Sequence, residues 1–501
     1  MTDPVRLLAS KIADRTCRYG VIGLGYVGLP LAIAFTKKGV HVVGFEVDRS
    51  KVKAINAGIS YIPDVPASDV AAAKQAGRLE ATTDFARLAE CDVISICVPT
   101  PLSKSRDPDV SYVAAATESV RKALRPGQLI VLESTTYPGM TEEFLRPPLE
   151  KAGYVVGKDI AIAFSPERVD PGNPKYGVEN TPKVVGGCEA VSTKLAADFY
   201  RIAVDTVVEV SSAAAAEMAK LLENTFRSVN IALVNEVAIM CDRLGLDVRE
   251  VVHAAASKPF GFMAFQPGPG TGGHCIPLDP LYLSWKLRTL EYRARFVELS
   301  DDVNLGMPRY VVERAATALN DVCKSLKGSR VLVLGVAYKR DVDDVRESPS
   351  LEIIRHLKRG GAEVHYADPH IPETDVHGVM MKSVKVDPKS LATYDCVVVA
   401  TDHRAFPWDD IARHAALIVD SRGAVPRDKV RGILLPLSGP AVRGADAPSD
   451  ARAKKPAPTA KAAAKPLVPS RRPVGVKAAP KASPAAPAKK SAAKRPDGAP
   501  S

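Results

Sequence analysis

The chain has 501 residues, of which 46% are hydrophobic and 6% aromatic, and its formal net charge is +11. This length and composition are those of a globular protein with two to four domains, each large enough for its own core. Residues 440–501 hold 14 Lys and Arg against three Asp, which accounts for the whole net charge, so residues 1–439 are neutral overall. Charge therefore gives no reason to expect that the folded part binds nucleic acid.

The eight cysteines are spread widely and include no CxxC pair, a spacing that predicts neither a zinc site nor a disulfide framework. The N-terminus lacks the charged, apolar and small-residue pattern of a secretory signal. The one long apolar stretch, residues 21–35, is broken by three glycines and a proline and is too short to span a bilayer. We therefore expect no metal, no membrane span and a reducing, cytoplasmic compartment.

Residues 1–210 alternate short apolar runs with helical patterns. Residues 19–24 and 41–46 predict strands on either side of a helix over residues 27–38. Further strands are expected at residues 91–98, 128–133 and 161–164. Near-continuous apolar strands separated by helices are typical of a parallel sheet covered on both faces, so we expect a doubly wound, Rossmann-like domain here.

Residues 211–244 contain no Gly or Pro and are rich in Ala, Leu and Glu. They predict one helix of about 34 residues, roughly 50 Å long. Because one small domain cannot cover a helix of that length, we expect it to join two domains and to form a dimer face. The alternative is a helix hairpin with a turn near residues 227–230. We assign residues 211–328 to a central helical domain.

The alternating pattern returns in residues 329–438, which we assign to a second doubly wound α/β domain. Its expected helix covers residues 350–359, and its expected strands are 330–336, 363–366, 396–400 and 417–419. Residues 439–501 contain Ala, Lys, Pro and Ser with almost no large apolar residue, so burial cannot offset the entropy cost of ordering them. We expect a disordered basic tail that either binds a polyanion weakly or only aids solubility.

The first chemical motif is a glycine-rich turn between a predicted strand and a predicted helix. Gly23, Gly25 and Gly28 form a GxGxxG pattern, and Glu46 closes the next predicted strand. Such glycines allow the backbone to approach a pyrophosphate at the helix N-terminus. Glu46 can accept hydrogen bonds from ribose hydroxyls and would repel a 2′-phosphate, so the motif predicts NAD rather than NADP as cofactor.

The second motif places a cysteine in a loop dense with glycine. Cys275 ends the run at residues 268–275, and Asp279 follows four residues later. A lone cysteine is more often buried and inert. A thiol beside a nicotinamide has a specific use, however, because it adds to an aldehyde to give a thiohemiacetal. Oxidation of that adduct gives a thioester, which water hydrolyses to an acid.

Seven short motifs resemble those of the UDP-glucose/GDP-mannose dehydrogenase family, in that family's order, over residues 18 to about 435. They are residues 23–28 (GLGYVG), 98–100 (VPT), 134–135 (ST), 164–171 (FSPERVDP), 220–224 (KLLEN), 272–275 (GGHC) and 346–349 (RESP). Within the family, residues 257–263 (SKPFGFM) are most similar to the loop of UDP-N-acetyl-D-glucosamine 6-dehydrogenases. The fold implied is α/β, with two Rossmann-like domains joined by a long central helix.

The resemblance implies catalytic roles. Cys275 would be the nucleophile. Lys220 and Asn224 are four residues apart on the predicted helix and share a face, so together they would hold the substrate oxygen as an alkoxide and later as an oxyanion. Glu167 would be the general base, acting through a water with Thr135.

The resemblance also implies binding roles, and Asp279 would orient the water or the substrate. The residues expected against NAD are Gly23, Gly25, Tyr26, Val27, Gly28, Glu46, Lys51, Thr100 and Thr135. Those expected at the substrate are Arg168, Val169, Lys220, Asn224, Arg227, Gly272, Lys339, Arg346 and Arg422. Glu46 stands where the family more often has Asp, and its extra methylene should shift the ribose slightly. An equally weighted reading makes Arg346 a structural ion-pair partner.

The expected activity is the NAD-dependent, four-electron oxidation of the C6 alcohol of a UDP-sugar to the uronic acid, which would supply surface polysaccharide synthesis. UDP-N-acetylglucosamine is the expected substrate. The alternatives are UDP-N-acetylmannosamine, UDP-glucose or GDP-mannose. A protein that binds polyanions through its tail is a further alternative, but the neutral body and Cys275 disfavour it as the main role. We expect a homodimer or a higher homo-oligomer formed through the central helix.

Overall fold

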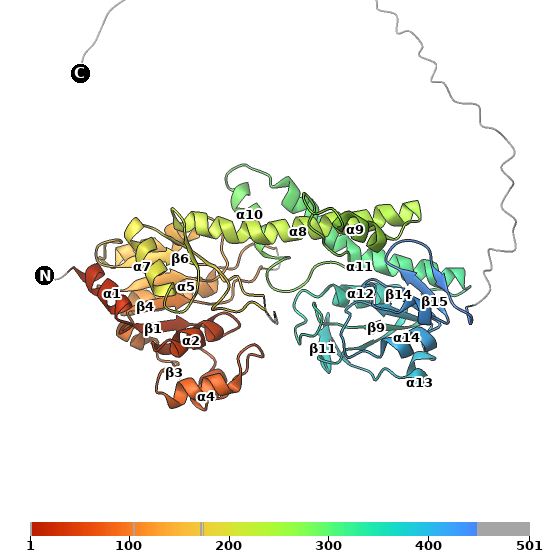
Figure 1. Cartoon of the computed structure of the whole chain (residues 1–501), viewed down its shortest axis with the longest axis horizontal. Helices are drawn as coiled ribbons and strands as arrows, with labels where there is room; N and C mark the ends of the chain where they lie inside the picture. Colours follow the sequence, from red (N-terminus) through yellow and green to blue (C-terminus); the bar gives the residue numbers. More distant parts are fainter. Residues whose placement is uncertain (1–2, 104–105, 171–172, 174, 448–501) are drawn as a thin grey trace, which may run out of the picture. The chain divides into compact units, whose positions relative to one another are not determined.

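The computed structural model describes residues 3–103, 106–170, 173 and 175–447, and the structural statements below concern that part of the chain (Figure 1). Most of the expected tail, residues 448–501, lies outside it. No helix among the described residues is both long enough and apolar enough to cross a membrane.

An eight-stranded sheet forms the N-terminal domain. In sheet order its strands are β3 (Leu79–Thr82), β2 (His41–Phe45), β1 (Arg18–Ile22), β4 (Val93–Ile96), β5 (Leu129–Leu132), β6 (Ala161–Phe164), β7 (Lys183–Gly187) and β8 (Val207–Glu209). Neighbouring strands pair in parallel, except β6 and β7. The strand order reverses between β1 and β4, and doubly wound folds bind ligands at the carboxyl ends of strands beside such a reversal.

Helices connect the strands of this sheet. The α-helices are α1 (Pro4–Ala13), α2 (Gly28–Lys37), α3 (Arg49–Asn56), α4 (Ala67–Gln75), α5 (Ser111–Ala123), α6 (Arg146–Lys151) and α7 (Ala190–Tyr200). Two short turns of other helix types, η1 (Phe85–Glu90) and η2 (Thr141–Leu145), complete the set. The expected doubly wound domain is confirmed.

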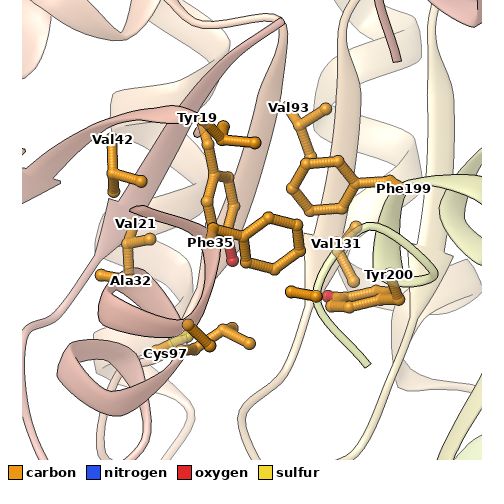
Figure 2. Packing of buried hydrophobic residues seen from close by; sticks show 14 of the residues in the cluster. Tyr19, Val21, Ala32, Phe35, Val42, Val93, Cys97, Val131, Phe199 and Tyr200 are labelled. Carbon is orange, nitrogen blue, oxygen red and sulfur yellow. The ribbon is translucent and has the colours of Figure 1, made fainter. Parts of the chain in front are cut away.

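Aromatic side chains pack α2 and α7 against β1 (Figure 2). Phe35 of α2 stacks on Phe199 of α7 with ring centroids 4.3 Å apart, and Tyr19 of β1 lies 4.8 Å from both rings. All three side chains are fully buried. This packing fixes the helix that follows the glycine-rich turn against the strand that precedes it.

Helix α8 (Ala213–Leu244) is one continuous helix of 32 residues. The Ser212 side chain caps its start by accepting a hydrogen bond from Ala215 N, and Gly245 ends it in the left-handed region at φ 71°. The predicted single helix is confirmed. The hairpin alternative is wrong, because residues 227–230 are helical.

Helix α8 contributes to the cores of both domains. Ala213 and Leu221 near its start pack among residues of β4, β5 and β6, whereas Val234 and Cys241 near its end pack with β9 and α12 of the C-terminal domain. The other central helices are α9 (Val248–Ala256), α10 (Asp279–Arg288) and α11 (Arg295–Asp321), and α11 packs along α8. The expectation that this helix joins two domains is therefore confirmed.

A six-stranded sheet forms the C-terminal domain. In sheet order its strands are β10 (Glu363–Ala367), β9 (Arg330–Leu334), β13 (Cys396–Val399), β14 (Leu417–Asp420), β15 (Ile433–Pro436) and β16 (Val442–Arg443). Its helices are α12 (Pro349–Arg359), α13 (Pro388–Leu391), α14 (Trp408–His414) and the short turn η3 (Arg427–Lys429). A separate hairpin consists of β11 (Glu373–Val376) and β12 (Val379–Lys382).

The expected start of the tail at residue 439 is wrong. Strand β16 pairs antiparallel with β15, and Gly444 N donates to Gly432 O beside it. Asp446 N then donates to Arg431 O. These hydrogen bonds satisfy backbone groups at the edge of the sheet, which composition alone does not reveal. The folded chain thus continues to residue 447.

Candidate active site

The turn between β1 and α2 leaves room for a ligand. Gly23 has φ 90°, in the left-handed region, and a Cβ on Gly28 would lie 1.9 Å from Gly23 O. A Cβ on Gly25 would meet nothing within 4 Å, and Gly25 O accepts a hydrogen bond from Leu29 N in the first turn of α2. The open space at Gly25 therefore adjoins a helix N-terminus, which suits a pyrophosphate.

Glu46 lies directly after β2 and braces this turn. It is 7% exposed, and its Oε2 accepts a hydrogen bond of 3.1 Å from Leu24 N. Its Oε1 accepts hydrogen bonds from Val47 N and Asp48 N, and Lys51 Nζ lies 3.9 Å from Oε2. The carboxylate is thus fixed beside the glycine-rich turn and keeps acceptor capacity for ribose hydroxyls. This arrangement fits NAD.

The loops after β4 and β5 are tied together near the same edge of the sheet. Val98 N donates to Ser134 Oγ at 2.9 Å, and that hydroxyl donates to Val98 O at 2.8 Å. Buried Thr100 and half-buried Thr135 follow in these two loops. Thr100 O accepts a hydrogen bond from the Tyr282 hydroxyl of α10. The predicted cofactor residues Thr100 and Thr135 therefore lie next to the strand reversal.

Cys275 lies half-buried just before α10, and Asp279 is the first residue of that helix. Burial and the charge of Asp279 raise the pKa of the Cys275 thiol to about 11, against the opposing effect of Lys220. Burial also raises the pKa of Asp279 to about 6, while Lys220 and the Asn224 amide act to lower it. The thiol is therefore protonated at neutral pH, so its attack requires a proton acceptor.

Lys220 and Asn224 of α8 both face this group. Asn224 is buried, and its Nδ2 donates to Asp279 Oδ2 at 2.5 Å. Lys220 Nζ donates to Glu167 O at 2.7 Å. Their spacing of one helical turn places both on one side of α8, as predicted. Each contacts a neighbouring site residue and keeps further N–H groups that can donate hydrogen bonds to a substrate oxygen.

Glu167 lies in the segment after β6, and its carboxylate is held from two sides. Its Oε1 accepts hydrogen bonds from Arg168 N at 2.8 Å and Val169 N at 2.6 Å. Its Oε2 lies 4.0 Å from Lys183 Nζ of β7. Glu167, Lys183 and Val169 help to line a cavity of about 10 Å³, which has room for about one water.

The glycine loop packs on the C-terminal domain. A Cβ on Gly272 would lie 2.8 Å from Glu347 O, and one on Gly273 would lie 2.7 Å from the Tyr338 ring. Gly273 N also donates to Arg346 O at 2.9 Å. Close approach to another domain therefore requires small residues in this loop.

Arg346 reaches the cofactor turn as well as its own domain. Its guanidinium lies 5.5 Å from the centre of the Tyr26 ring and pairs with Asp344 at 2.6 Å. Arg346 thus forms an ion pair and also borders the site, so both proposed roles, substrate binding and structural ion pairing, have support. Lys339 pairs with Asp170 at 2.9 Å, and Arg422 pairs with Asp402 at 3.2 Å.

Two expected substrate residues are placed differently from the rest. The Arg168 guanidinium pairs with Glu223 of α8 at 2.6 Å and also donates to Pro182 O, so it connects two elements. Arg227 is exposed on α8. The structure thus brings Cys275, Asp279, Asn224, Lys220 and Glu167 together, and it leaves Arg227 on the surface.

Sequence reasoning missed a buried pair beneath Glu167. Lys183 Nζ lies 2.7 Å from Glu133 Oε2, with 6% and 0% of the two side chains exposed. The signal in the sequence was one charged residue beside each of two apolar runs: Glu133 follows the apolar run of β5, and Lys183 begins β7.

Comparison with known proteins identifies the family to which the chain belongs. Models of the UDP-glucose/GDP-mannose dehydrogenase family match its NAD binding domain at residues 17–204, its central domain at 214–305 and its UDP binding domain at 332–427. The chain is 36% identical over 394 residues to a UDP-N-acetyl-D-glucosamine 6-dehydrogenase of Pseudomonas aeruginosa, covering 78% of this chain and 91% of the relative. It is 35% identical over 423 residues to a UDP-N-acetyl-D-mannosamine dehydrogenase of Salmonella typhi, covering 80% and 98%.

A solved structure of a related protein supports the same family assignment. The UDP-D-ManNAc dehydrogenase of Pyrococcus horikoshii matches with a TM-score of 0.77 and 32% identity, over 84% of this chain and 99% of that chain. The matched regions include the glycine-rich turn, the Cys275 loop and the C-terminal domain. The chain therefore belongs to the UDP-glucose/GDP-mannose dehydrogenase family and is an NAD-dependent UDP-sugar dehydrogenase.

Proposed function

We propose that this enzyme oxidises the C6 alcohol of UDP-N-acetylglucosamine to a carboxylate, with Cys275 as a covalent nucleophile. The observation that carries the proposal is the arrangement of Cys275, Asp279, Asn224 and Lys220 around one place, where the glycine loop meets α8 and α10. The glycine-rich turn and Glu46 would hold NAD, which would supply the hydride acceptor for two successive oxidations. The residues of the chain supply proton transfer, charge stabilisation and the covalent bond.

In the first oxidation the alcohol loses a C6 hydrogen as hydride and its hydroxyl proton to a base. Lys220 and Asn224 retain N–H donors that stabilise the alkoxide as it forms. Glu167, with Thr135, takes the proton through a water. The product at this stage is an aldehyde that stays in the site.

In the second oxidation the Cys275 sulfur attacks the aldehyde carbon. The S–C bond forms as the thiol proton passes to Asp279, and Asp279 then gives this proton to the former carbonyl oxygen, which completes a thiohemiacetal. Because the pKa of Asp279 is raised to about 6, this carboxylate is ionised at neutral pH and can accept that proton. Loss of hydride and of the hydroxyl proton then gives a thioester.

Hydrolysis completes the reaction. Glu167 removes a proton from a water that attacks the thioester carbon, and Lys220 and Asn224 stabilise the oxyanion. The C–S bond breaks, the carboxylic acid leaves, and the Cys275 sulfur regains a proton. The sum is one alcohol, two NAD⁺ and one water converted to one carboxylic acid, two NADH and two protons.

The cationic residues of the C-terminal domain are proposed to bind the UDP moiety. Lys339, Arg346 and Arg422 lie on the domain that matches the family's UDP binding domain. Burial lowers the pKa of Arg422, and a diphosphate would add to the charge compensation that Asp402 supplies to this half-buried cation. Arg168 and Val169 are proposed to border the sugar through the Glu167 segment.

UDP-N-acetylmannosamine is the second candidate substrate. The relatives that act on the two sugars are nearly equally similar to this chain, at 36% and 35% identity. The loop at residues 257–263 favours UDP-N-acetylglucosamine, because its sequence SKPFGFM resembles that subfamily. Steady-state kcat/KM on purified enzyme with NAD and a panel of UDP-N-acetylglucosamine, UDP-N-acetylmannosamine, UDP-glucose and GDP-mannose tests this choice. The highest value with any other sugar would contradict it.

A homodimer is proposed, with α8 as its face. Large apolar residues are exposed along this helix at spacings of four and seven, which places them on one side: Leu222, Phe226, Leu233, Met240 and Leu244. An apolar stripe of this length on a monomer normally marks an association surface. Light scattering should give twice the chain mass. Leu233→Asp should shift the protein to monomer, whereas Leu7→Asp, at an exposed residue of α1, should not.

The eight cysteines are all free, as expected for a reducing compartment, and we propose a cytoplasmic location on that ground.

A further inference from the structure

A buried ionic network lies beneath Glu167. Glu133 follows β5 and Lys183 begins β7, and their side chains are 0% and 6% exposed. Lys183 Nζ lies 2.7 Å from Glu133 Oε2 and donates to Pro166 O at 3.3 Å. Glu167 Oε2 is 4.0 Å from the same nitrogen. An ammonium has three hydrogens, so two reach buried oxygens and one remains available toward Glu167.

The other oxygen of Glu133 is also fully engaged. Glu133 Oε1 accepts hydrogen bonds from the Tyr200 hydroxyl and from Ser95 Oγ, and the latter accepts one from the Tyr19 hydroxyl. Lys183 Nζ lies 5.0 Å from the centre of the Tyr200 ring. Burial acts to lower the pKa of Lys183, but the charges of Glu133 and Glu167 raise it overall. The ammonium is therefore a permanent positive charge at neutral pH.

Stability alone does not account for this pair. Removing two charges from water costs several kcal/mol for each ion, and apolar residues of similar size often stabilise such a position equally well. The pair lies next to the segment that carries Glu167, and Lys183 holds the carbonyl of the preceding residue, Pro166. Its location thus connects it to the proposed general base.

We propose that Lys183 is a positioning residue for the reaction, which holds the Glu167 segment through Pro166 O and supplies a buried cation 4.0 Å from the Glu167 carboxylate, while Glu133 opposes the charge of that cation. The inference rests on the proposed role of Glu167 as base. Lys183 bonds to Glu133 and to Pro166 O, the residue before Glu167, so we infer that it acts on the rate through Glu167.

Charged and titratable groups face Glu167 from several elements. They are Lys183 of β7, Glu133 after β5, Lys220 of α8, Cys275 of the glycine loop, Cys97 after β4 and Tyr19 of β1. Lys183 and Lys220 are the cations of this set, and Glu133 is its buried anion. Cys97 and Tyr19 have strongly raised pKa values because they are buried, so they stay neutral in the working range.

The test compares two variants that should shift the pH dependence of kcat in opposite directions. The measured quantity is kcat as a function of pH with both substrates saturating. The part of the profile that matters is the fall in kcat at acid pH, the acid limb, which is assigned to Glu167 because Glu167→Gln should remove it. Lys183→Met takes away the cation and should move that limb up by about 1 pH unit, since an opposite charge at this distance is worth that much or more. Glu133→Gln takes away the opposing anion and should move the limb down.

Three controls separate a positioning role from a structural one. Lys183→Arg keeps the charge and should restore the wild-type limb. Lys194→Met removes an exposed lysine that pairs with Asp198 and should leave the limb in place. The KM values for NAD and for the sugar should stay near wild type in Glu133→Gln, because Glu133 is buried and both its oxygens are engaged by Lys183, Tyr200 and Ser95. If Lys183→Met does not fold, Glu133→Gln still tests the direction of the pH shift.

Opposite shifts in the two variants would support the inference. An unmoved limb, or a shift of both variants in the same direction, would overturn it and leave the pair a structural feature. Failure of the proposed function has a different signature. In that case Glu167→Gln itself would retain wild-type kcat and the acid limb.

Discussion

The side-chain amide of Asn224 donates to the carboxylate of Asp279 at 2.5 Å and so connects α8 to the first turn of α10. Both residues are buried. Because Cys275 lies in the turn just before Asp279, this bond fixes the long helix relative to the proposed nucleophile. In the proposed mechanism Asn224 therefore combines two tasks, since it orients Asp279 and would offer a second N–H to the substrate oxygen.

Asn224→Ala should lower kcat roughly 10²- to 10³-fold with a much smaller rise in KM, because it removes a preorganised donor to the oxyanion. Initial rates at varied sugar concentration measure the two effects. Asn230→Ala is the matched control on the same helix, since Asn230 is half-buried and its amide donates to Phe226 O within α8. A change confined to KM would mean that Asn224 provides ordinary ground-state binding.

Asp279→Asn should make the fold more stable at neutral pH while it lowers activity. The folded protein raises the pKa of Asp279 from 3.8 to about 6, so between these values it binds a proton that the unfolded chain has lost. Stability therefore falls as pH rises from about 4 to about 6, and the loss above that range is about 3 kcal/mol at most. Thermal unfolding at pH 5 and pH 8 should show a gain for Asp279→Asn that is larger at pH 8. An equal or smaller gain at pH 8 would contradict the burial argument.

Cys275→Ser should lose steady formation of the acid by several orders of magnitude, because serine makes neither the thiohemiacetal nor the thioester. Binding of NAD and of the UDP-sugar, measured by calorimetry, should persist. Cys323→Ser, at an exposed cysteine, should behave as wild type. A kcat near normal in Cys275→Ser would exclude covalent catalysis.

The basic tail is expected to be dispensable for turnover, and β16 gives the correct place to cut. A chain that ends at residue 447 keeps the hydrogen bonds between residues 431–433 and 442–446. Its kcat, KM and thermal midpoint should match those of the full chain. Weak polyanion binding by the full chain, if present, should decrease steeply with salt. Loss of activity or unfolding on truncation would show that the tail is part of the enzyme.

Local patterns in the sequence predicted much of this structure. The glycine-rich turn, Glu46 after the second strand and the uninterrupted helix over α8 all follow from short-range rules of backbone freedom, strand order and helix propensity. The i, i+4 spacing of Lys220 and Asn224 correctly placed both on one side of that helix. These features depend on residues that lie close together in the chain.

Features that depend on distant residues were not predictable in the same way. Strand β16 forms because its backbone meets the edge of β15, and nothing in residues 440–447 reveals that partner. Gly272 and Gly273 are required by Tyr338 and Glu347 of another domain. The Glu133–Lys183 pair joins residues 50 positions apart. Each arises from packing between elements, which motif spacing does not encode.

The central claim, that one active site carries out both oxidations through Cys275, is tested most directly by reaction stoichiometry. A limiting amount of UDP-N-acetylglucosamine is converted to completion in excess NAD, and the NADH formed is compared with the sugar consumed. Covalent catalysis by Cys275 predicts two NADH for each sugar and no free aldehyde detectable by a carbonyl-trapping reagent, because the thiohemiacetal retains the intermediate. One NADH for each sugar, with aldehyde released into solution, would contradict it.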